Sequence, residues 1–221
     1  MQTTFAKDVT VDELQDKFGL EQTEEQSQFR EWQDDLPEIS EAERQVLNHI
    51  KSNFKNLNRD RPMSEEAVKM VVLSPLLDLA GFYQPPFKLL TEQSTEISAE
   101  DEGTLYKGSI DVLVVLKRFW ILVIESKSTR FDVMMALPQA LTYLLSCPER
   151  VGEASPLENR PPFALLINGR EFVFVKLIPT TPPQYILSKA FSLLNPSDDL
   201  ADVLRVLKRI GKLIEPNSNA Q

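Results

Sequence analysis

Two short apolar runs in the middle of the chain carry the strongest pattern. Ile110–Leu116 and Phe119–Ile124 are rich in Val and Ile, and the polar pair Lys117-Arg118 separates them. Runs this short, β-branched and bounded by polar residues predict two strands joined by a tight turn. Because apolar residues occupy both alternating faces of each run, the sheet that contains them should be covered on both sides.

Helices and further strands are predicted around this hairpin. Capping signals and apolar residues at helical spacing mark Thr10–Gly19, Ser40–Leu57, Ser64–Ala80, Asp132–Ser146 and Leu200–Ile214. Strand patterns mark Phe87–Ile97, Phe163–Ile167, Glu171–Leu177 and Tyr185–Leu187, the last as a short edge strand. This order predicts an α/β (α+β) fold, with a mixed β-sheet flanked by helices.

Glycine and proline residues predict the details of several connections. Asn168-Gly169 favours a type I′ turn between two strands, and Ser98–Gly103 should be a turn after the first strand. Pro75 should kink or split its helix, while Pro138 fits only in the first turn of a helix. The polar stretch Glu149–Arg160 should be a loop.

Composition limits the class of protein. The chain has 221 residues, of which 42% are hydrophobic and 26% are charged, and this is ordinary for one globular core with an appendage. A single cysteine excludes an internal disulfide framework and fits a reducing compartment. We find no apolar run of about 20 residues and no signal-peptide pattern, so we expect a cytoplasmic protein without a membrane partner.

The net charge of −9 is concentrated at the N-terminus. Residues 1–66 hold 16 acids against 8 bases, whereas residues 67–221 hold 17 acids against 16 bases. We expect residues 1–37 to form an acidic arm, 38–215 the main domain, and 216–221 a disordered tail. The arm could be a solvated tail, or a segment that docks a partner or mimics DNA.

Three charged residues interrupt or end the apolar runs. Asp111 lies within the first run, and Glu125 and Lys127 end the second. Glu125 and Lys127 should project from the same face of their strand, while Ser126 points away. Buried charges are costly unless they are paired or bind a metal. Two carboxylates beside an ammonium suit a divalent cation with oxygen ligands, together with a lysine that orients a water.

The spacing of these charges resembles a known signature. Asp111, thirteen intervening residues and then Glu125-Ser126-Lys127 resemble the D…ExK motif of the PD-(D/E)XK nuclease superfamily. Within it the chain resembles the N-terminal nuclease domain of type I restriction motor subunits, in a stand-alone cyanobacterial form without the helicase motor. The proline that precedes the aspartate in the superfamily is replaced here by Ile110.

Two further stretches extend the resemblance. The segment Ser64–Lys69 resembles the opening helix of the restriction-subunit domain, whose first-turn glutamate falls on Glu65. That acid could instead only favour the positive helix N-terminus. Gln139 and Tyr143, four apart on one helical face, resemble the QxxxY motif that follows the ExK strand. They could instead be a rim residue and a core tyrosine.

The resemblance implies a restriction-endonuclease-like fold and a metal-dependent nuclease. Asp111, Glu125 and the Ser126 carbonyl would hold Mg²⁺ or Mn²⁺, and Glu65 would complete the metal shell. Lys127 would position the attacking water, while Gln139 and Tyr143 would steady the lysine and the phosphate. The substrate would be DNA.

Other functions stay open at this stage. The acidic charge also suits a catalytically idle nuclease fold that binds nucleic acid or protein, and an RNA-directed or repair nuclease would share the same chemistry. So few basic residues predict weak, salt-sensitive DNA binding unless a protein partner or homo-oligomer helps. The basic residues Arg205, Lys208, Arg209 and Lys212 could form a solvated face or a DNA-contact strip. His49, the single histidine, suits neither a zinc site nor a nucleophilic triad.

The hairpin register decides whether the two carboxylates can share a site. A two-residue turn at Lys117-Arg118 would set Asp111 opposite Ile124, on the wrong face of the sheet. A three-residue turn, or a bulge, would set Asp111 opposite Glu125. We expect one of these two arrangements.

Overall fold

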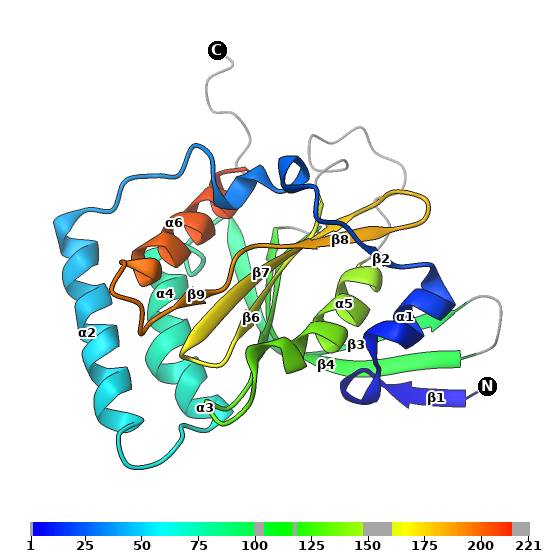
Figure 1. Cartoon of the computed structure of the whole chain (residues 1–221), viewed down its shortest axis with the longest axis horizontal. Coiled ribbons are helices and arrows are strands. Elements are labelled where there is room, and N and C mark those ends of the chain that lie inside the picture. The colour runs from blue at the N-terminus through cyan, green and yellow to red at the C-terminus, as the bar shows by residue number, and fades with distance from the viewer. Residues whose placement is uncertain (1, 100–103, 117–118, 148–160, 214–221) are drawn as a thin grey trace.

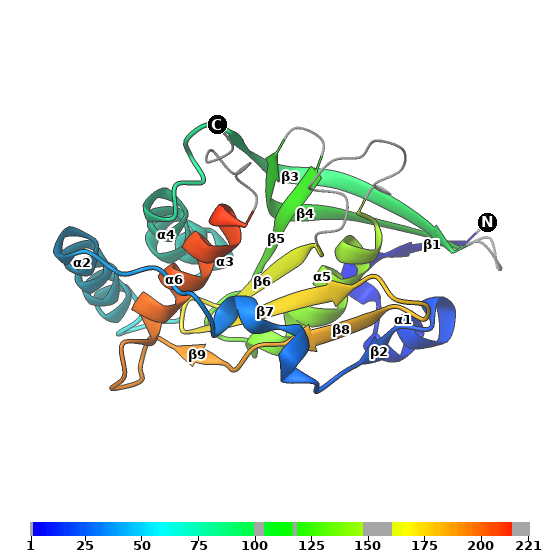
Figure 2. The same ribbon diagram turned by 90° about the horizontal axis from the view of Figure 1, so that it is seen from above.

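A nine-stranded mixed sheet with helices on both faces forms the body of the protein (Figures 1 and 2). The computed structural model describes residues 2–99, 104–116, 119–147 and 161–213. The expected tail 216–221, the loop 149–160, the pair 117–118 and most of the turn 98–103 lie outside these ranges.

The strands and helices follow the predicted order. The strands are β1 (Gln2–Phe5), β2 (Glu21–Gln22), β3 (Phe87–Ala99), β4 (Thr104–Leu116), β5 (Phe119–Ser126), β6 (Phe163–Ile167), β7 (Glu171–Ile178), β8 (Gln184–Leu187) and β9 (Phe191–Ser192). The helices are α1 (Val11–Phe18), α2 (Glu41–Leu57), α3 (Glu65–Val68), α4 (Ser74–Leu79), α5 (Leu137–Leu145) and α6 (Asp199–Lys212). This confirms the α/β class with a mixed sheet.

The sheet combines an antiparallel meander with a parallel crossover. The strand order is β1-β4-β5-β6-β7-β8-β2, with β3 also paired to β4 and β9 to β7. β3, β4 and β5 form the meander, and β6 then runs parallel to β5. The connection from β5 to β6 contains α5, so the C-terminal end of β5 points toward the start of that helix.

Two hydrophobic cores lie on opposite faces of the sheet. On one face, α2, α4 and α6 pack side chains such as Leu47, Leu76 and Leu204 against Val112, Val114 and Leu116 of β4. On the other face, α1 and α5 pack Leu14 and Leu141 against the opposite side of the meander. The sheet is therefore covered on both sides, as its double-sided apolar runs predict.

The helix preceding the meander is interrupted, in line with the prediction from Pro75. Ser64 caps α3, the segment Lys69–Leu73 is a π-helical stretch, and α4 follows with Pro75 in its first turn. Proline has no N–H to donate and its ring crowds the preceding turn, so a wider turn before it relieves both problems. Gly81, with φ of 84°, follows the end of α4.

Three local predictions need correction. The hairpin at Asn168-Gly169 is present, but only Gly169 has a positive φ, so the turn is not type I′. The Asn168 side chain instead accepts the N–H groups of Arg170 and Glu171 and sets the turn itself. The helix expected at 132–146 is a 3₁₀ turn followed by α5, which puts Pro138 in the first turn. β8 is not an edge strand, because β2 pairs with it.

The acidic N-terminal segment is packed against the rest of the domain, which contradicts a solvated tail. β1 pairs with β4, and the Phe29 ring is fully buried and stacks on Phe163 with 6.0 Å between ring centroids. Glu31 forms an ion pair with Lys176. Whether residues 1–37 and 38–215 act as separate units stays a prediction.

Three basic residues of α6 form ion pairs within the domain. Lys208 pairs with Glu43, Arg209 with Asp35, and Arg205 with Asp202 on its own helix. These pairings disfavour a DNA-contact strip on α6. His49 is exposed on α2, and none of the helices in the described ranges is long and apolar enough to span a membrane.

Candidate functional site

The site lies where β4 changes its neighbour. β3 pairs with one edge of β4 along almost its full length, so β1 and β5 must share the other edge. β1 pairs with residues 104–107 and β5 with residues 112–116. Residues 108–111 lie between these two pairings, and no ladder on that edge covers them in the described sheet. Within this gap the backbone groups of β4 have no partner among the described strands on that edge.

A β-bulge brings the two carboxylates together. Near the turn, Leu116 pairs with Phe119 and Val115 with Trp120, as a two-residue turn requires. The register then shifts, and Val112 pairs with Ile124. One step further this register sets Asp111 opposite Glu125. The predicted alternative of a bulge that restores the shared face is therefore confirmed.

Asp111 is held by two hydrogen bonds from different parts of the chain. The backbone N–H of Ser126 donates to its Oδ2 at 2.8 Å, and the Lys69 ammonium donates to its Oδ1 at 2.8 Å. On the other side, Glu92 of β3 has φ of 50° and is skipped in the pairing with β4. Asp111 thus lies at an irregular point on both edges of its strand, where regular backbone pairing with β3 and β5 is interrupted.

Glu125 is a buried carboxylate with an unsatisfied oxygen. Its side chain is fully buried, and its Oε2 has no hydrogen-bond partner. Its Oε1 accepts a long bond of 3.5 Å from the Asp111 N–H. Burial and the neighbouring charge of Asp111 raise the pKa of Glu125 well above its ordinary value, although Lys127 opposes this. An orphaned buried carboxylate oxygen is the kind of group that a cation would satisfy.

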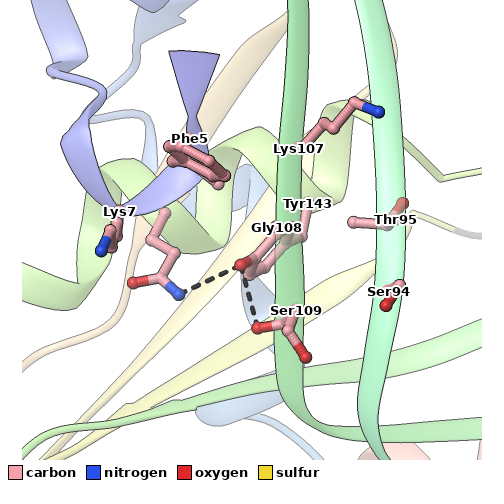
Figure 3. Close-up of a pocket in the computed structure, with 10 residues that line it drawn as sticks. Phe5, Lys7, Ser94, Thr95, Lys107, Gly108, Ser109 and Tyr143 are labelled. Carbon is pink, nitrogen blue, oxygen red and sulfur yellow. Dashed lines mark hydrogen bonds between the residues drawn. The ribbon is translucent and has the colours of Figure 1, made fainter. Parts of the chain in front are cut away.

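Lys127 begins a chain of hydrogen bonds that ends at the gap in β4. Its ammonium lies 4.0 Å from Glu125 Oε2 and donates to Gln139 Oε1 at 3.2 Å. Gln139 Nε2 donates to the Tyr143 hydroxyl at 3.0 Å, and that hydroxyl donates to the Ser109 carbonyl at 3.0 Å. Gln139 therefore contacts Lys127 directly, and Tyr143 acts on it through Gln139. Figure 3 shows the Tyr143 hydroxyl directed at Ser109.

Glu65 faces the same group of charges from the first turn of α3. Burial raises the pKa of Glu65 above its ordinary value, and the charges of Lys127 and Asp111 act on it in opposite directions. However, the described residues contain no group of three or more His, Cys, Asp or Glu side chains arranged to hold a metal. The structure therefore brings Glu65 near Asp111 and Lys127 without placing it in a ligand cluster.

Lys69 is a site residue that the sequence interpretation did not single out. It lies in the π-helical stretch four residues after Glu65, a spacing that could have indicated the same helix face. Burial alone would lower its pKa, but the hydrogen bond and charge of Asp111, helped by Glu92, raise it. Its ammonium occupies a position on Asp111 that a metal cation could otherwise use.

The donor set fits a hard divalent cation. Two carboxylates on neighbouring strands, one of them with an unpaired buried oxygen, supply oxygen ligands of the type that Mg²⁺ and Mn²⁺ prefer. The Ser126 side chain points away from Asp111, and its buried Oγ has no partner, so a contribution from Ser126 would come from its backbone.

Comparison with known proteins decides the family. The family model described as "Type I restriction enzyme R protein N terminus" matches residues 6–182. The chain belongs to this family. The resemblance inferred from Asp111, Glu125 and Lys127 is thus confirmed at the level of the family, and the chain is a restriction-type nuclease domain.

A solved structure and a search of curated proteins complete the comparison. The restriction-subunit domain resembles a fragment described as an HsdR subunit of a type I restriction enzyme from Vibrio vulnificus YJ016, with 18% sequence identity and a TM-score of 0.39. The likeness covers 66% of this chain and 26% of that chain, so the domain spans about a quarter of its length. A search of curated proteins found no match.

The raised pKa of Glu125 predicts a pH-dependent effect of its replacement. Because the folded-state pKa lies above the unfolded value near 4.5, the carboxyl favours folding below that pH and loses this contribution as pH rises through the folded pKa. In chelator, the melting temperature of Glu125→Gln relative to wild type should therefore increase between about pH 4.5 and pH 8. Thermal scans across this range test it, with exposed Glu24→Gln as the control. A difference that stays flat or falls with pH would contradict the assignment.

Tyr143→Phe should separate the role of its hydroxyl from its role in packing. The ring is buried and stays in place, while the bonds to Gln139 and Ser109 are lost. We expect about 1 kcal/mol of lost stability and a cleavage rate lowered by roughly tenfold, because Gln139 no longer holds a fixed position for Lys127. Urea unfolding and plasmid nicking measure the two effects. Tyr185→Phe, which loses a bond to Gln22 away from the site, should keep its cleavage rate.

Proposed function

We propose that this restriction-subunit domain is a metal-dependent nuclease that hydrolyses phosphodiester bonds in DNA. The observation that supports it most is the meeting of Asp111, Glu125 and Lys127 at one gap in the sheet, with a buried oxygen of Glu125 left unpaired. A buried carboxylate oxygen without a hydrogen bond is costly, and a bound cation would offset that cost.

Mg²⁺ or Mn²⁺ would be held by Asp111, Glu125 and the Ser126 backbone carbonyl, and Glu65, on which the Asp111 charge acts, would be the further ligand. When bound, the metal would act as a Lewis acid on the phosphate and lower the pKa of a coordinated water. The Ser126 N–H keeps Asp111 oriented by holding its Oδ2, while Oδ1, which accepts a hydrogen bond from Lys69, would be the oxygen that the metal takes over.

Lys127 would orient the attacking water and balance the negative charge that develops on the phosphate. Gln139 accepts one of its N–H bonds and Tyr143 fixes Gln139, so the ammonium keeps its other donors available for water and phosphate. Lys69 would leave Asp111 when the metal binds, and its ammonium would then be available to the phosphate.

A binding module without catalysis is the second candidate. The observation that favours it is the Lys69–Asp111 ion pair, which satisfies Asp111 without a metal. A net charge of −9 also gives little electrostatic attraction for DNA, so a protein partner or homo-oligomer would have to supply it. An RNA-directed nuclease would use the same residues, and parallel assays with RNA distinguish it.

Nicking of supercoiled plasmid DNA tests the proposal. At low salt with Mg²⁺ or Mn²⁺, the protein should convert supercoiled plasmid to open-circular or linear forms, and excess EDTA should stop the reaction. Isothermal titration should detect Mn²⁺ binding by the same preparation. Tight binding of DNA without any nicking in either metal would favour the binding module.

A further inference from the structure

A cavity of about 430 Å³ lies beside the candidate site, on the side of Tyr143 (Figure 3). Its wall is formed by four separate parts of the chain: Phe5–Lys7, Ser94-Thr95 of β3, Lys107–Ser109 of β4, and Gln139 with Tyr143 of α5. In Figure 3, Phe5 and Lys7 lie to one side of β4, and Ser94 and Thr95 lie to the other. The cavity size is typical of a site for one small-molecule-sized group.

The side chain of Gln139 links this cavity to the cluster of charges around Lys127. Gln139 lines the cavity and accepts a hydrogen bond from the Lys127 ammonium at 3.2 Å. Ser109, also in the wall, accepts the hydroxyl of Tyr143. A group bound in the cavity would therefore be separated from Lys127 by the Gln139 side chain.

The absence of a side chain at Gly108 lets Tyr143 and Ala6 pack closely against β4 at the cavity wall. A Cβ added at Gly108 would lie 2.4 Å from the Tyr143 hydroxyl oxygen and 2.9 Å from the Cβ of Ala6. Any side chain at this position would displace Tyr143 from its bond to Ser109 or push the N-terminal segment away. Glycine at position 108 therefore allows β4, α5 and the segment around Ala6 to approach one another closely beside the candidate site.

Phe5 and Lys7 give the cavity rim an aromatic face and a positive charge. The side chain of Phe5 is 54% exposed although pairing between β1 and β4 fixes its backbone. The Lys7 ammonium lies 5.9 Å from the centre of the Phe5 ring. Exposed aromatic rings beside cations are the means by which proteins bind unpaired nucleotides, through stacking on the base and neutralisation of the phosphate. Bases in a duplex have both faces covered and cannot stack on such a ring.

We propose that this cavity binds one unpaired nucleotide of a DNA strand, adjacent to the phosphate that Lys127 faces, with the base on Phe5 and its phosphate beside Lys7. The reference to a cleaved phosphate rests on the proposed nuclease function, but the binding itself can be tested without it. The domain should then prefer single-stranded or frayed DNA over a closed duplex.

Fluorescence anisotropy in EDTA tests this preference, because no cleavage occurs there. The probes are fluorescein-labelled oligothymidylate and a labelled blunt hairpin duplex. Wild type should bind the single strand more tightly, and Phe5→Leu, which keeps an apolar side chain but loses the ring, should weaken that binding by about tenfold. Phe5→Trp should restore it. Leu194→Ala is the matched control, since Leu194 is 56% exposed in a different region.

The salt dependence of binding tests Lys7 separately. Loss of one phosphate contact should lower the slope of log affinity against log salt by about 0.7 in Lys7→Ala. Lys55→Ala removes an exposed lysine of α2 and should leave the slope unchanged. Thermal melts of each variant establish that the fold is retained.

The outcomes separate this inference from the proposed function. If Phe5→Leu binds the single strand as wild type does, or if wild type binds only the duplex or no DNA, the cavity assignment is wrong. Plasmid nicking by the same wild-type preparation would still support the nuclease. Single-strand binding that depends on Phe5, without nicking in Mg²⁺ or Mn²⁺, would support the cavity and contradict the nuclease.

Discussion

Lys127→Ala should lower DNA cleavage by at least about 100-fold while leaving Mn²⁺ binding intact. In the proposed mechanism the ammonium would stabilise charge on the reacting phosphate, and loss of one such group from an enclosed site typically costs about 10²–10³ in rate. It is not a metal ligand, and its removal also takes a positive charge from within 4.0 Å of Glu125. Metal affinity should therefore stay the same or increase slightly. Plasmid nicking and isothermal titration with Mn²⁺ measure the two quantities.

The control for this comparison is Lys51→Ala. Lys51 is similar in exposure, with 23% of its side chain accessible against 19% for Lys127, and it pairs with Asp198 outside the site. Both variants are purified by the same protocol, so that contaminating nuclease would appear equally in each. Equal cleavage by wild type and Lys127→Ala would remove the basis for the enzyme and leave the binding module.

Asp111→Asn should lose both cleavage and metal binding. The amide oxygen can still accept the Ser126 N–H, so the bond that orients the side chain is retained. One negative charge is lost, however, and a hard cation then has Glu125 as its nearest charged ligand. We expect Mn²⁺ affinity to fall by at least about tenfold and cleavage to become undetectable. Titration calorimetry and nicking with increasing Mn²⁺ provide the measurements.

Asp198→Asn is the matched control for this variant. Asp198 also accepts bonds from cationic side chains, Lys51 and Arg44, but it lies away from the site. It should keep wild-type metal affinity and cleavage. If Asp111→Asn binds Mn²⁺ as tightly as wild type, the metal does not use Asp111, and Lys69 is its permanent partner.

Local sequence signals were sufficient to predict the meander and the pairing of its charges. The β-branched runs specify the two strands, and the requirement that Asp111 and Glu125 share a face specifies a bulge. The capping boxes at Thr10 and Ser40 likewise mark the true starts of α1 and α2. These predictions succeed because each depends on residues close in sequence or on the two-residue period of a strand.

Contacts between distant segments were not predictable in the same way. β1 pairs with β4 across about 100 residues, and nothing in its short, polar sequence distinguishes it from a tail. The Lys69–Asp111 ion pair depends on how the π-helical stretch rotates the helix over β4, which periodicity does not specify. The catalytic and metal-binding roles of Asp111, Glu125, Ser126 and Lys127, like those of Glu65, Gln139 and Tyr143, stay predictions that activity and metal-binding measurements test.

At the gap in the edge of β4, two of the candidate site residues form hydrogen bonds with backbone groups. The Tyr143 hydroxyl donates to the Ser109 carbonyl, and the Asp111 carboxylate accepts the N–H of Ser126. Both side chains therefore satisfy backbone groups that a neighbouring strand would otherwise bond. A relative without the proposed nuclease activity would therefore still have a structural use for both residues. The Lys127 ammonium makes no comparable bond to the backbone of the described residues, since it bonds the Gln139 side chain and lies 4.0 Å from the Glu125 carboxylate. Among relatives, retention of Asp111 and Tyr143 would thus indicate an intact fold, whereas retention of Lys127 would indicate that the proposed catalytic function is also kept.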